Sequence, residues 1–211
     1  MKKLFASLLM IAVSQLAVAG DPQAGEAKTA TCAACHGADG NSPAPAFPSL
    51  AGQHANYTLK QLQDMKKSLA EGGRPVPEMA GMLEPFSDQD LADIAAFYAG
   101  QTMQGKTTDA ELLALGESVY RAGITRKEVA SCAGCHAPDG RGNRGAGYPA
   151  LAGQHAAYIE KQLKAFRLGA DEPEARGARV NDGDSRTMRD VAGNMSDLEI
   201  RAVASFIAGL R

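Results

Sequence analysis

The sequence predicts an all-α protein built from two tandem, related domains, and three observations lead to this fold class. The segment Leu-Ala-Gly-Gln-His stands at 50–54 and again at 151–155, and such self-similarity is typical of a duplicated domain. Patterns that start helices recur at matching places in both halves. No stretch shows the alternation of apolar and polar residues that indicates a half-buried strand.

The first 19 residues have the features of a secretory signal peptide. Lys2 and Lys3 precede an apolar run at 4–18, and Ala-Val-Ala at 17–19 supplies small residues for cleavage. The alternative is a membrane anchor, but a span needs about 20 apolar residues, and this run is shorter and interrupted by polar ones. We expect cleavage near Ala19 and a soluble product in the periplasm.

The remaining chain is mildly acidic. Loss of Lys2 and Lys3 reduces the 22 basic residues to 20 against 24 acidic ones, a formal charge of −4. No run of basic residues favours nucleic-acid binding, and no later segment approaches membrane-spanning length. The sequence therefore predicts no nucleic-acid partner, and it leaves peripheral membrane association open.

The repeat assigns 20–101 to the first domain, 102–107 to a polar linker and 108–211 to the second domain. In the first domain a loop rich in Gly and Pro at 37–48 precedes a middle helix. Ser-Asp-Gln-Asp at 87–90 should open the last helix. The middle helix is marked by residues at helical spacing, namely Tyr57, Leu62, Met65 and Leu69.

The second domain should repeat this order. Thr-Asp-Ala-Glu at 108–111 is a capping-box pattern that predicts a helix running to about Arg121. A loop at 137–149 precedes the middle helix, and Ser-Asp-Leu-Glu at 196–199 opens the last one. The middle helix here is marked by Tyr158, Leu163 and Phe166.

The motif Cys-x-x-Cys-His occurs at 32–36 and at 132–136, and the two copies use all four cysteines of the chain. This spacing is typical of covalent haem attachment, in which two thiols bond to the haem vinyl groups and the adjacent histidine binds the iron. The sequence therefore predicts two covalently bound haem c groups. Their attachment residues are Cys32, Cys35, Cys132 and Cys135, and their axial histidines are His36 and His136.

Thiol redox sites, a four-cysteine zinc site and two disulfides are the alternatives. A redox motif of this kind should lie beside a βαβ pattern, and none is visible. The two pairs are also farther apart in sequence than is usual for a zinc site. Neither a redox motif nor a zinc site explains why a histidine follows each pair. With no tryptophan and 5% aromatic residues, each half has a thin core that a large apolar cofactor would complete, so the haem-free chain should lack stable tertiary structure.

The duplication also suggests the sixth iron ligand. Met79 lies eight residues before Ser87, and Met188 lies eight before Ser196, and no other methionines match at equal offset. We therefore predict Met79 and Met188 as distal ligands, with a role in packing as the alternative. At the other offsets, Met82 matches Val191 and Met195 matches Phe86, so Met82 and Met195 should be structural.

Two further histidines offer a different ligand set. His54 and His155 end the repeated Leu-Ala-Gly-Gln-His segment, each just before an expected helix. They follow the axial histidines by only 18 and 19 residues, which makes a crossing to the opposite haem face strained. Helix entry or a polar contact near the haem edge is their alternative role.

The chain resembles the cytochrome c4 family of periplasmic dihaem electron carriers. The resemblance rests on both Cys-x-x-Cys-His motifs, the repeated Leu-Ala-Gly-Gln-His, and the segments at 41–45, 79–83, 87–91 and 181–184. It implies two class I cytochrome c domains related by a pseudo-twofold axis, with haem propionate edges facing each other. It also implies histidine and methionine on both irons.

Other class I features are carried over by position. Pro48 and Pro149 resemble the proline whose carbonyl accepts the other N–H of the axial histidine. Gly25 and Gly116 resemble the glycine that lets the first helix cross the last. Gly25 precedes its motif by seven residues and Gly116 by sixteen, so we expect an insertion around 125–130.

These ligands predict an electron carrier rather than an enzyme, because two closed irons leave no site for a small-molecule substrate. The resemblance implies a quinol-oxidising complex as donor and a terminal oxidase as acceptor. One alternative is the cytochrome subunit of an oxidoreductase such as a sulfur-compound dehydrogenase. A dihaem peroxidase is another, and it would need an iron that loses its sixth ligand.

Overall fold

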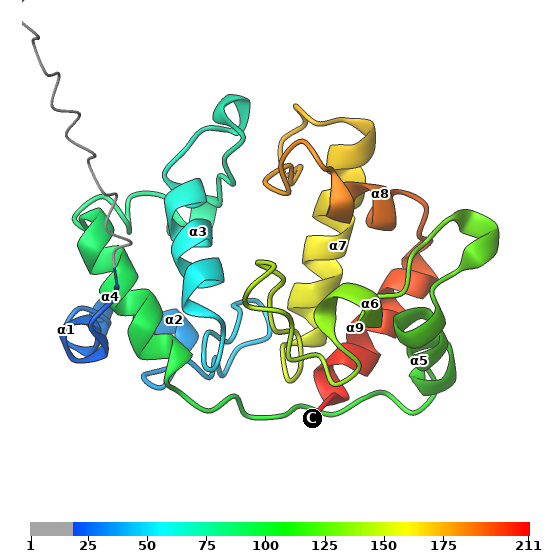
Figure 1. Ribbon diagram of the computed structural model, residues 1–211, viewed down its shortest axis with the longest axis horizontal. Helices are drawn as coiled ribbons and strands as arrows, with labels where there is room; N and C mark the ends of the chain where they lie inside the picture. Colours follow the sequence, from blue (N-terminus) through cyan, green and yellow to red (C-terminus); the bar gives the residue numbers. More distant parts are fainter. Residues whose placement is uncertain (1–18) are drawn as a thin grey trace, which may run out of the picture.

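The computed structural model describes residues 19–211, and these fold into two helical halves (Figure 1). Two isolated bridges, Ile124 with Val129 and Asn143 with Tyr148, are the extended pairings within this range. The all-α fold class is therefore confirmed. The expected signal peptide lies outside the described residues except for Ala19. Over 19–211, no helix is both long and apolar enough to cross a bilayer.

The first half holds α1 to α4, and the second holds α5 to α9 (Figure 1). The helices of the first half are α1 (Pro22–Glu26), α2 (Ala30–His36), α3 (Ala55–Met65) and α4 (Asp88–Ala99), with 3₁₀ turns η1 (Leu69–Glu71) and η2 (Pro77–Met79). Those of the second half are α5 (Leu113–Ala122), α6 (Ala133–His136), α7 (Ala156–Asp171), α8 (Thr187–Gly193) and α9 (Asp197–Gly209), with the 3₁₀ turn η3 (Thr125–Lys127).

The last helix of each half begins where the sequence predicts. The Ser87 hydroxyl accepts the backbone N–H of Asp90, and the Asp90 carboxylate accepts the backbone N–H of Ser87. Ser196 and Glu199 make the same reciprocal pair at the start of α9. Both capping boxes satisfy N–H groups that the first turn of a helix otherwise leaves free.

Two expected helix boundaries are wrong. The helix predicted from Thr108 begins at Leu113, because the backbone N–H of Asp109 donates to the Ser205 hydroxyl and holds this segment against α9. The middle helix of the first half ends at Met65, so Leu69 lies in the separate turn η1. Ser68 and Glu71 form a capping box that starts this new turn.

The first and last helices of each half cross at a glycine, as the family resemblance implies. A Cβ atom on Gly25 would lie 2.0 Å from the Asp93 carbonyl oxygen of α4, and one on Gly116 would lie 2.3 Å from the Ala202 carbonyl oxygen of α9. The expected insertion forms η3 and the Ile124–Val129 bridge. At both crossings the two helices can approach so closely only because glycine has no side chain.

Gly116→Ala should destabilise the second half. The new methyl group would collide with backbone and with the Phe206 Cβ atom, which would lie 2.8 Å away, so α5 must move off α9. Overpacking of this kind typically costs about 1–3 kcal/mol, which we expect as a lower free energy of unfolding in denaturant titrations. Gly134→Ala is the matched control, because its Cβ would meet nothing nearer than 3.5 Å and the first motif has Ala34 there. Equal stability of both variants would contradict this packing account.

The two halves meet through the repeated glutamines. The Gln53 side chain donates to the Ala150 carbonyl (2.8 Å) and accepts the Ala150 N–H (3.0 Å). Gln154 does the same with Ser49, at 2.8 and 2.9 Å. Each amide therefore pairs with the backbone of the other half as a neighbouring strand would. This exchange of equivalent contacts is the signature of a pseudo-twofold arrangement, with α3 and α7 on the facing sides (Figure 1).

Candidate functional site

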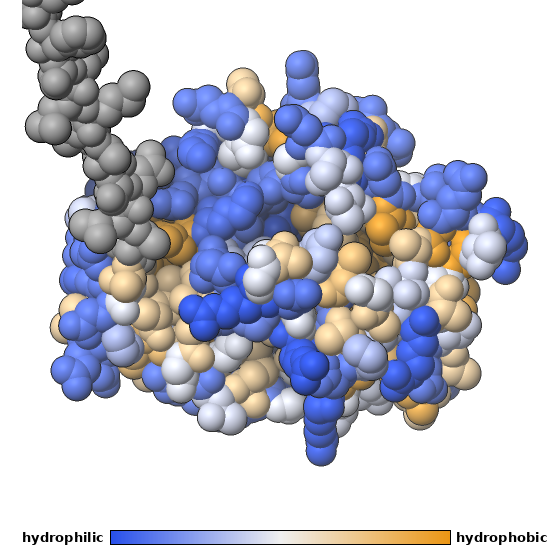
Figure 2. Space-filling view, viewed as in Figure 1, coloured by the Kyte–Doolittle hydropathy of each residue, from blue (hydrophilic) through white to orange (hydrophobic). Residues whose placement is uncertain are grey.

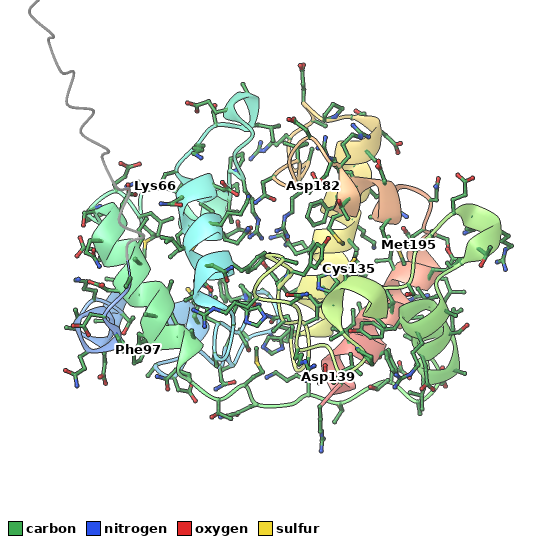
Figure 3. The ribbon with its side chains drawn as sticks, viewed as in Figure 1. Lys66, Phe97, Cys135, Asp139, Asp182 and Met195 are labelled. Carbon is green, nitrogen blue, oxygen red and sulfur yellow. The ribbon has the colours of Figure 1, made fainter. Side chains whose placement is uncertain are left out.

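Both Cys-x-x-Cys-His motifs lie on short helices that face the junction of the two halves. Cys32 and Cys35 lie on α2, which ends at His36. Cys132 lies immediately before α6, which contains Cys135 and ends at His136. Figure 3 shows Cys135 on the side of the second half that faces the first.

The axial histidines are held in the same way. His36 Nδ1 lies 2.8 Å from the Pro48 carbonyl oxygen, and His136 Nδ1 lies 2.9 Å from the Pro149 carbonyl oxygen. The carbonyl can only accept, so Nδ1 carries the proton and the Nε2 lone pair is left for a ligand. This confirms the proline contacts that the resemblance implies, and in the folded protein each contact fixes the orientation of the histidine ring.

Burial prepares these side chains for an apolar cofactor. Desolvation lowers the pKa of His36 and of His136, which favours the neutral imidazole that an iron requires. Burial also raises the pKa of Cys132 to about 11. The surroundings of both motifs are therefore too apolar to favour free charges, as suits a porphyrin.

A cavity of about 1370 Å³ connects the two motifs. Its walls include Cys32, His36, Cys132 and His136, together with apolar residues from both halves such as Leu62, Leu83, Ile94, Leu163, Phe166 and Val203. A second cavity of about 650 Å³ adjoins the first motif and is lined by Cys35, His36 and Met79. This space, its apolar walls and the thiol and imidazole donors fit two covalent haem c groups.

Both predicted distal methionines line the large cavity, but different structures carry them. Met79 is the last residue of η2, a single 3₁₀ turn. Met188 lies in α8, whose start is held by Asp182: one carboxylate oxygen accepts the Met188 and Arg189 N–H groups at 3.0 and 2.9 Å. The other oxygen accepts Arg189 Nε at 2.7 Å. The Asp182 carboxylate therefore holds the start of the segment that carries Met188, whereas among residues 19–211 no side chain caps the turn that carries Met79.

Of the two methionines expected to be structural, one is buried and the other is exposed. Met195 is buried in the core of the second half, as predicted, among α7 and α9 residues. Met82, by contrast, is 42% exposed, so its expected packing role is wrong. The segment after η2 forms a series of turns that leaves it on the surface.

The two histidines considered as alternative iron ligands make other contacts. His54 and His155 are the N-cap residues of α3 and α7, which confirms their place at helix entry. His155 Nε2 lies 2.8 Å from the Ser42 carbonyl oxygen of the other half, so this nitrogen is engaged in the junction. His54 Nε2 is buried and makes no hydrogen bond among residues 19–211, and neither histidine lines the large cavity.

The four cysteines are unbridged and do not converge. Within the described part of the chain, no group of three or more His, Cys, Asp or Glu side chains is placed to hold a metal ion directly. The two cysteine pairs therefore do not combine into the four-cysteine zinc site considered above. Each cysteine pair instead lies at its own motif, at a separate part of the cavity.

The sequence patterns did not reveal two buried arginines that line this cavity. Arg74 and Arg179 extend into it from the loops that precede the two methionine segments. Arg74 lies five residues before Met79, whereas Arg179 lies nine before Met188, so comparison at equal offset does not pair them. Asp182 was missed as a clamp because its target is a backbone whose course depends on the fold.

Comparison with known proteins gives a consistent result. The cytochrome c family model matches residues 23–102 and again 113–211. Cytochrome c4 of Pseudomonas aeruginosa is 49% identical over 212 residues, covering 100% of both chains. The crystal structure of reduced recombinant cytochrome c4 from Pseudomonas stutzeri superimposes with a TM-score of 0.85 at 51% identity, over 92% of this chain and 100% of that one. A thiosulfate dehydrogenase electron acceptor of Thiomonas intermedia is 35% identical, over 86% of this chain and 79% of its own.

Proposed function

We propose, from the premise that this chain belongs to the cytochrome c4 family and is a dihaem electron carrier, that it moves electrons in the periplasm between a quinol-oxidising complex and a terminal oxidase. The observation that carries this proposal is one cavity lined by both Cys-x-x-Cys-His motifs and both candidate methionines. Domains at 20–101 and 108–211 would each hold one redox centre, joined by the linker at 102–107.

The chain's own residues would hold the centres in a closed state. We assign the axial positions to His36 with Met79 and to His136 with Met188. When bound, each haem supplies a one-electron couple between Fe(II) and Fe(III). The thioether ligand favours the reduced metal, while the buried histidines and apolar walls exclude water and small molecules. Little rearrangement is then needed when an electron arrives or leaves.

A second candidate function rests on one relative. The protein from Thiomonas intermedia that is 35% identical bears the name thiosulfate dehydrogenase electron acceptor. The present chain would in that case receive electrons from a sulfur-compound dehydrogenase rather than from quinol oxidation. The fold and both centres would be the same, so only the donor separates the two functions. Closed irons at both sites would exclude the dihaem peroxidase.

Stopped-flow reduction separates the donors. The oxidised holoprotein is mixed either with membranes that contain a quinol-oxidising complex and a quinol, or with thiosulfate and a thiosulfate dehydrogenase. We expect fast reduction of both haems only by the first mixture, and fast reoxidation by membranes with a terminal oxidase. Reduction by the second mixture alone would support the alternative. Recovery of the mature protein in the periplasmic fraction, with its N-terminus near residue 20, tests the location.

A further inference from the structure

The segment that leads to Met188 is held by the first half of the molecule. Asn181 is 6% exposed, and its side-chain nitrogen donates to the Asp64 carboxylate of α3 at 2.8 Å. The same nitrogen donates to Gln61 Oε1 at 3.1 Å. Lys60 forms an ion pair with Asp64 and donates to the Asn181 carbonyl oxygen at 2.9 Å. One helix of the first half therefore binds both the side chain and the backbone of Asn181.

The residue after Asn181 binds the backbone of Met188. The Asp182 carboxylate accepts the N–H groups of Met188 and Arg189 at 3.0 and 2.9 Å, and it accepts Arg189 Nε at 2.7 Å. The side chains of Asp182 and Arg189 are 6% and 10% exposed, and Figure 3 shows Asp182 on the side of the second half that faces α3. Buried polar contacts therefore run from the first half to the backbone of Met188. We call Asp64, Asn181 and Asp182 the polar relay.

The position of the second half that corresponds to Asp64 carries alanine. The repeated Lys-Gln-Leu at 60–62 and 161–163 aligns Asp64 with Ala165. The backbone agrees, because the Asp64 carbonyl accepts the Arg74 N–H at 2.8 Å. The Ala165 carbonyl accepts the Arg179 N–H at 2.9 Å in the same way. The duplication therefore preserves the backbone contact, but only the first half has a carboxylate at this position.

The Met79 segment has an exposed contact with the opposite half instead. Glu78, the residue before Met79, pairs with Lys161 of α7 at 3.1 Å, and the two side chains are 51% and 59% exposed. Lys161 corresponds to Lys60 in the repeat, so the same lysine reaches across the junction in both directions. Water and salt screen an exposed ion pair, so it contributes little, whereas a buried hydrogen bond to a charged group contributes more.

The polar relay lies beneath a polar surface. Hydrophilic side chains gather over the upper middle of the face in Figure 2, the region where α3 and the segment at 179–188 lie in Figure 1. Asp64 and Asn181 are nevertheless each only 6% exposed. Water competes little for buried polar groups, and leaving one of them without a partner is costly, so the relay should restrict where the Met188 segment can lie.

We propose that Asp64 of the first half is a positioning residue for the distal ligand of the second centre, acting through Asn181 and Asp182. This inference rests on the proposed function, because it takes Met188 as that ligand. Docking of the two halves orders the Met188 segment, whereas the Met79 segment is ordered mainly within its own half. Removal of the Asp64 carboxylate should therefore loosen the methionine of the opposite half and leave the methionine of its own half in place.

Hydrogen exchange of the holoprotein, followed by NMR spectroscopy, tests the polar relay at single amides. In Asp64→Ala we expect the amide protons of Met188 and Arg189 to exchange about tenfold faster, as the loss of one buried hydrogen bond predicts. The amide proton of Met79 should keep the rate of the parent protein. Asp64→Asn keeps an oxygen that can accept from Asn181, so it should preserve most of the protection, and it serves where the alanine variant does not accumulate.

Two further variants show whether the contacts act as one series. Asn181→Ala should accelerate exchange at Met188 as much as Asp64→Ala does, and the double variant should add nothing, because both substitutions break the same path. Glu78→Ala is the matched control, since it removes the exposed carboxylate that joins the halves beside the other methionine. It should leave the exchange rates in both methionine segments unchanged.

The methyl resonances of the iron-bound methionines give a readout at the centres themselves. In the reduced protein the porphyrin ring shifts these resonances, and Met79→Ala and Met188→Ala assign them. In Asp64→Ala we expect the Met188 resonance to move and the Met79 resonance to stay. Unchanged exchange at Met188 in both Asp64→Ala and Asn181→Ala, or equal acceleration at Met79, would overturn the polar relay. A parent protein without haem, or two shifted resonances that survive in Met188→Ala, would instead refute the proposed function, and the exchange rates would still decide the relay.

Discussion

Replacing either of the two proposed distal methionines by alanine should remove half of the near-infrared band that arises from thioether-to-iron bonding. Met79 and Met188 both line the cavity that holds the two Cys-x-x-Cys-His motifs, and each belongs to a different half. If each binds one iron, Met79→Ala abolishes the contribution of the first centre and leaves the second. Met188→Ala does the reverse, and the double variant has no band.

The same variants should lower the potential of the altered centre. A thioether favours Fe(II), and its loss opens the sixth position to water or to an outside ligand such as carbon monoxide. Met82→Ala is the matched control, because Met82 lies three residues after Met79 and is 42% exposed. A full band in Met79→Ala or Met188→Ala would show that the ligand assignment fails at that site.

The haem-free chain should lack a cooperative tertiary structure. The buried core of the first half that packs as one cluster consists of Ile94, Phe97 and Tyr98, whereas that of the second half is several times larger. The cavity between them measures about 1370 Å³. Without a cofactor the apolar side chains that line this cavity lack packing partners, so we expect the empty structure to collapse or unfold.

A variant with all four cysteines changed to serine provides the haem-free chain. We expect it to lose near-ultraviolet dichroism and to unfold without a cooperative transition. Cys32→Ser with Cys35→Ser should affect the first half, and Cys132→Ser with Cys135→Ser the second, where the larger core should retain more structure. Native-like dichroism and a sharp thermal transition in the fourfold variant would contradict this account.

Sequence reasoning predicted the features that repeat. The helical class and the capping boxes of α4 and α9 follow from local patterns present in both halves, whereas the glycine crossings were implied by the family resemblance. It failed at Thr108, where the local capping pattern is correct but the contact of Asp109 with Ser205 of α9 prevails. Local propensity is a weak signal where a segment docks against a distant helix.

The junction was the least predictable part of the site. The repeated Leu-Ala-Gly-Gln-His segment was visible, but nothing in the sequence says that Gln53 and Gln154 pair with the backbone of the opposite half. Arg74 and Arg179 lie at unequal offsets from the methionines, so the duplication did not reveal them. Contacts between two domains depend on how they dock, which periodicity within one domain does not encode.

Intact-mass spectrometry of the purified mature protein, followed by exposure of the reduced form to carbon monoxide, tests the central claim most directly. We predict a mass equal to that of the polypeptide plus two haem groups, with no spectral change on adding the gas, because all four axial positions are held by the protein. A colourless polypeptide at its bare mass, or gas uptake at both irons under mild conditions, would contradict the claim that the chain folds around two closed, covalently held haems.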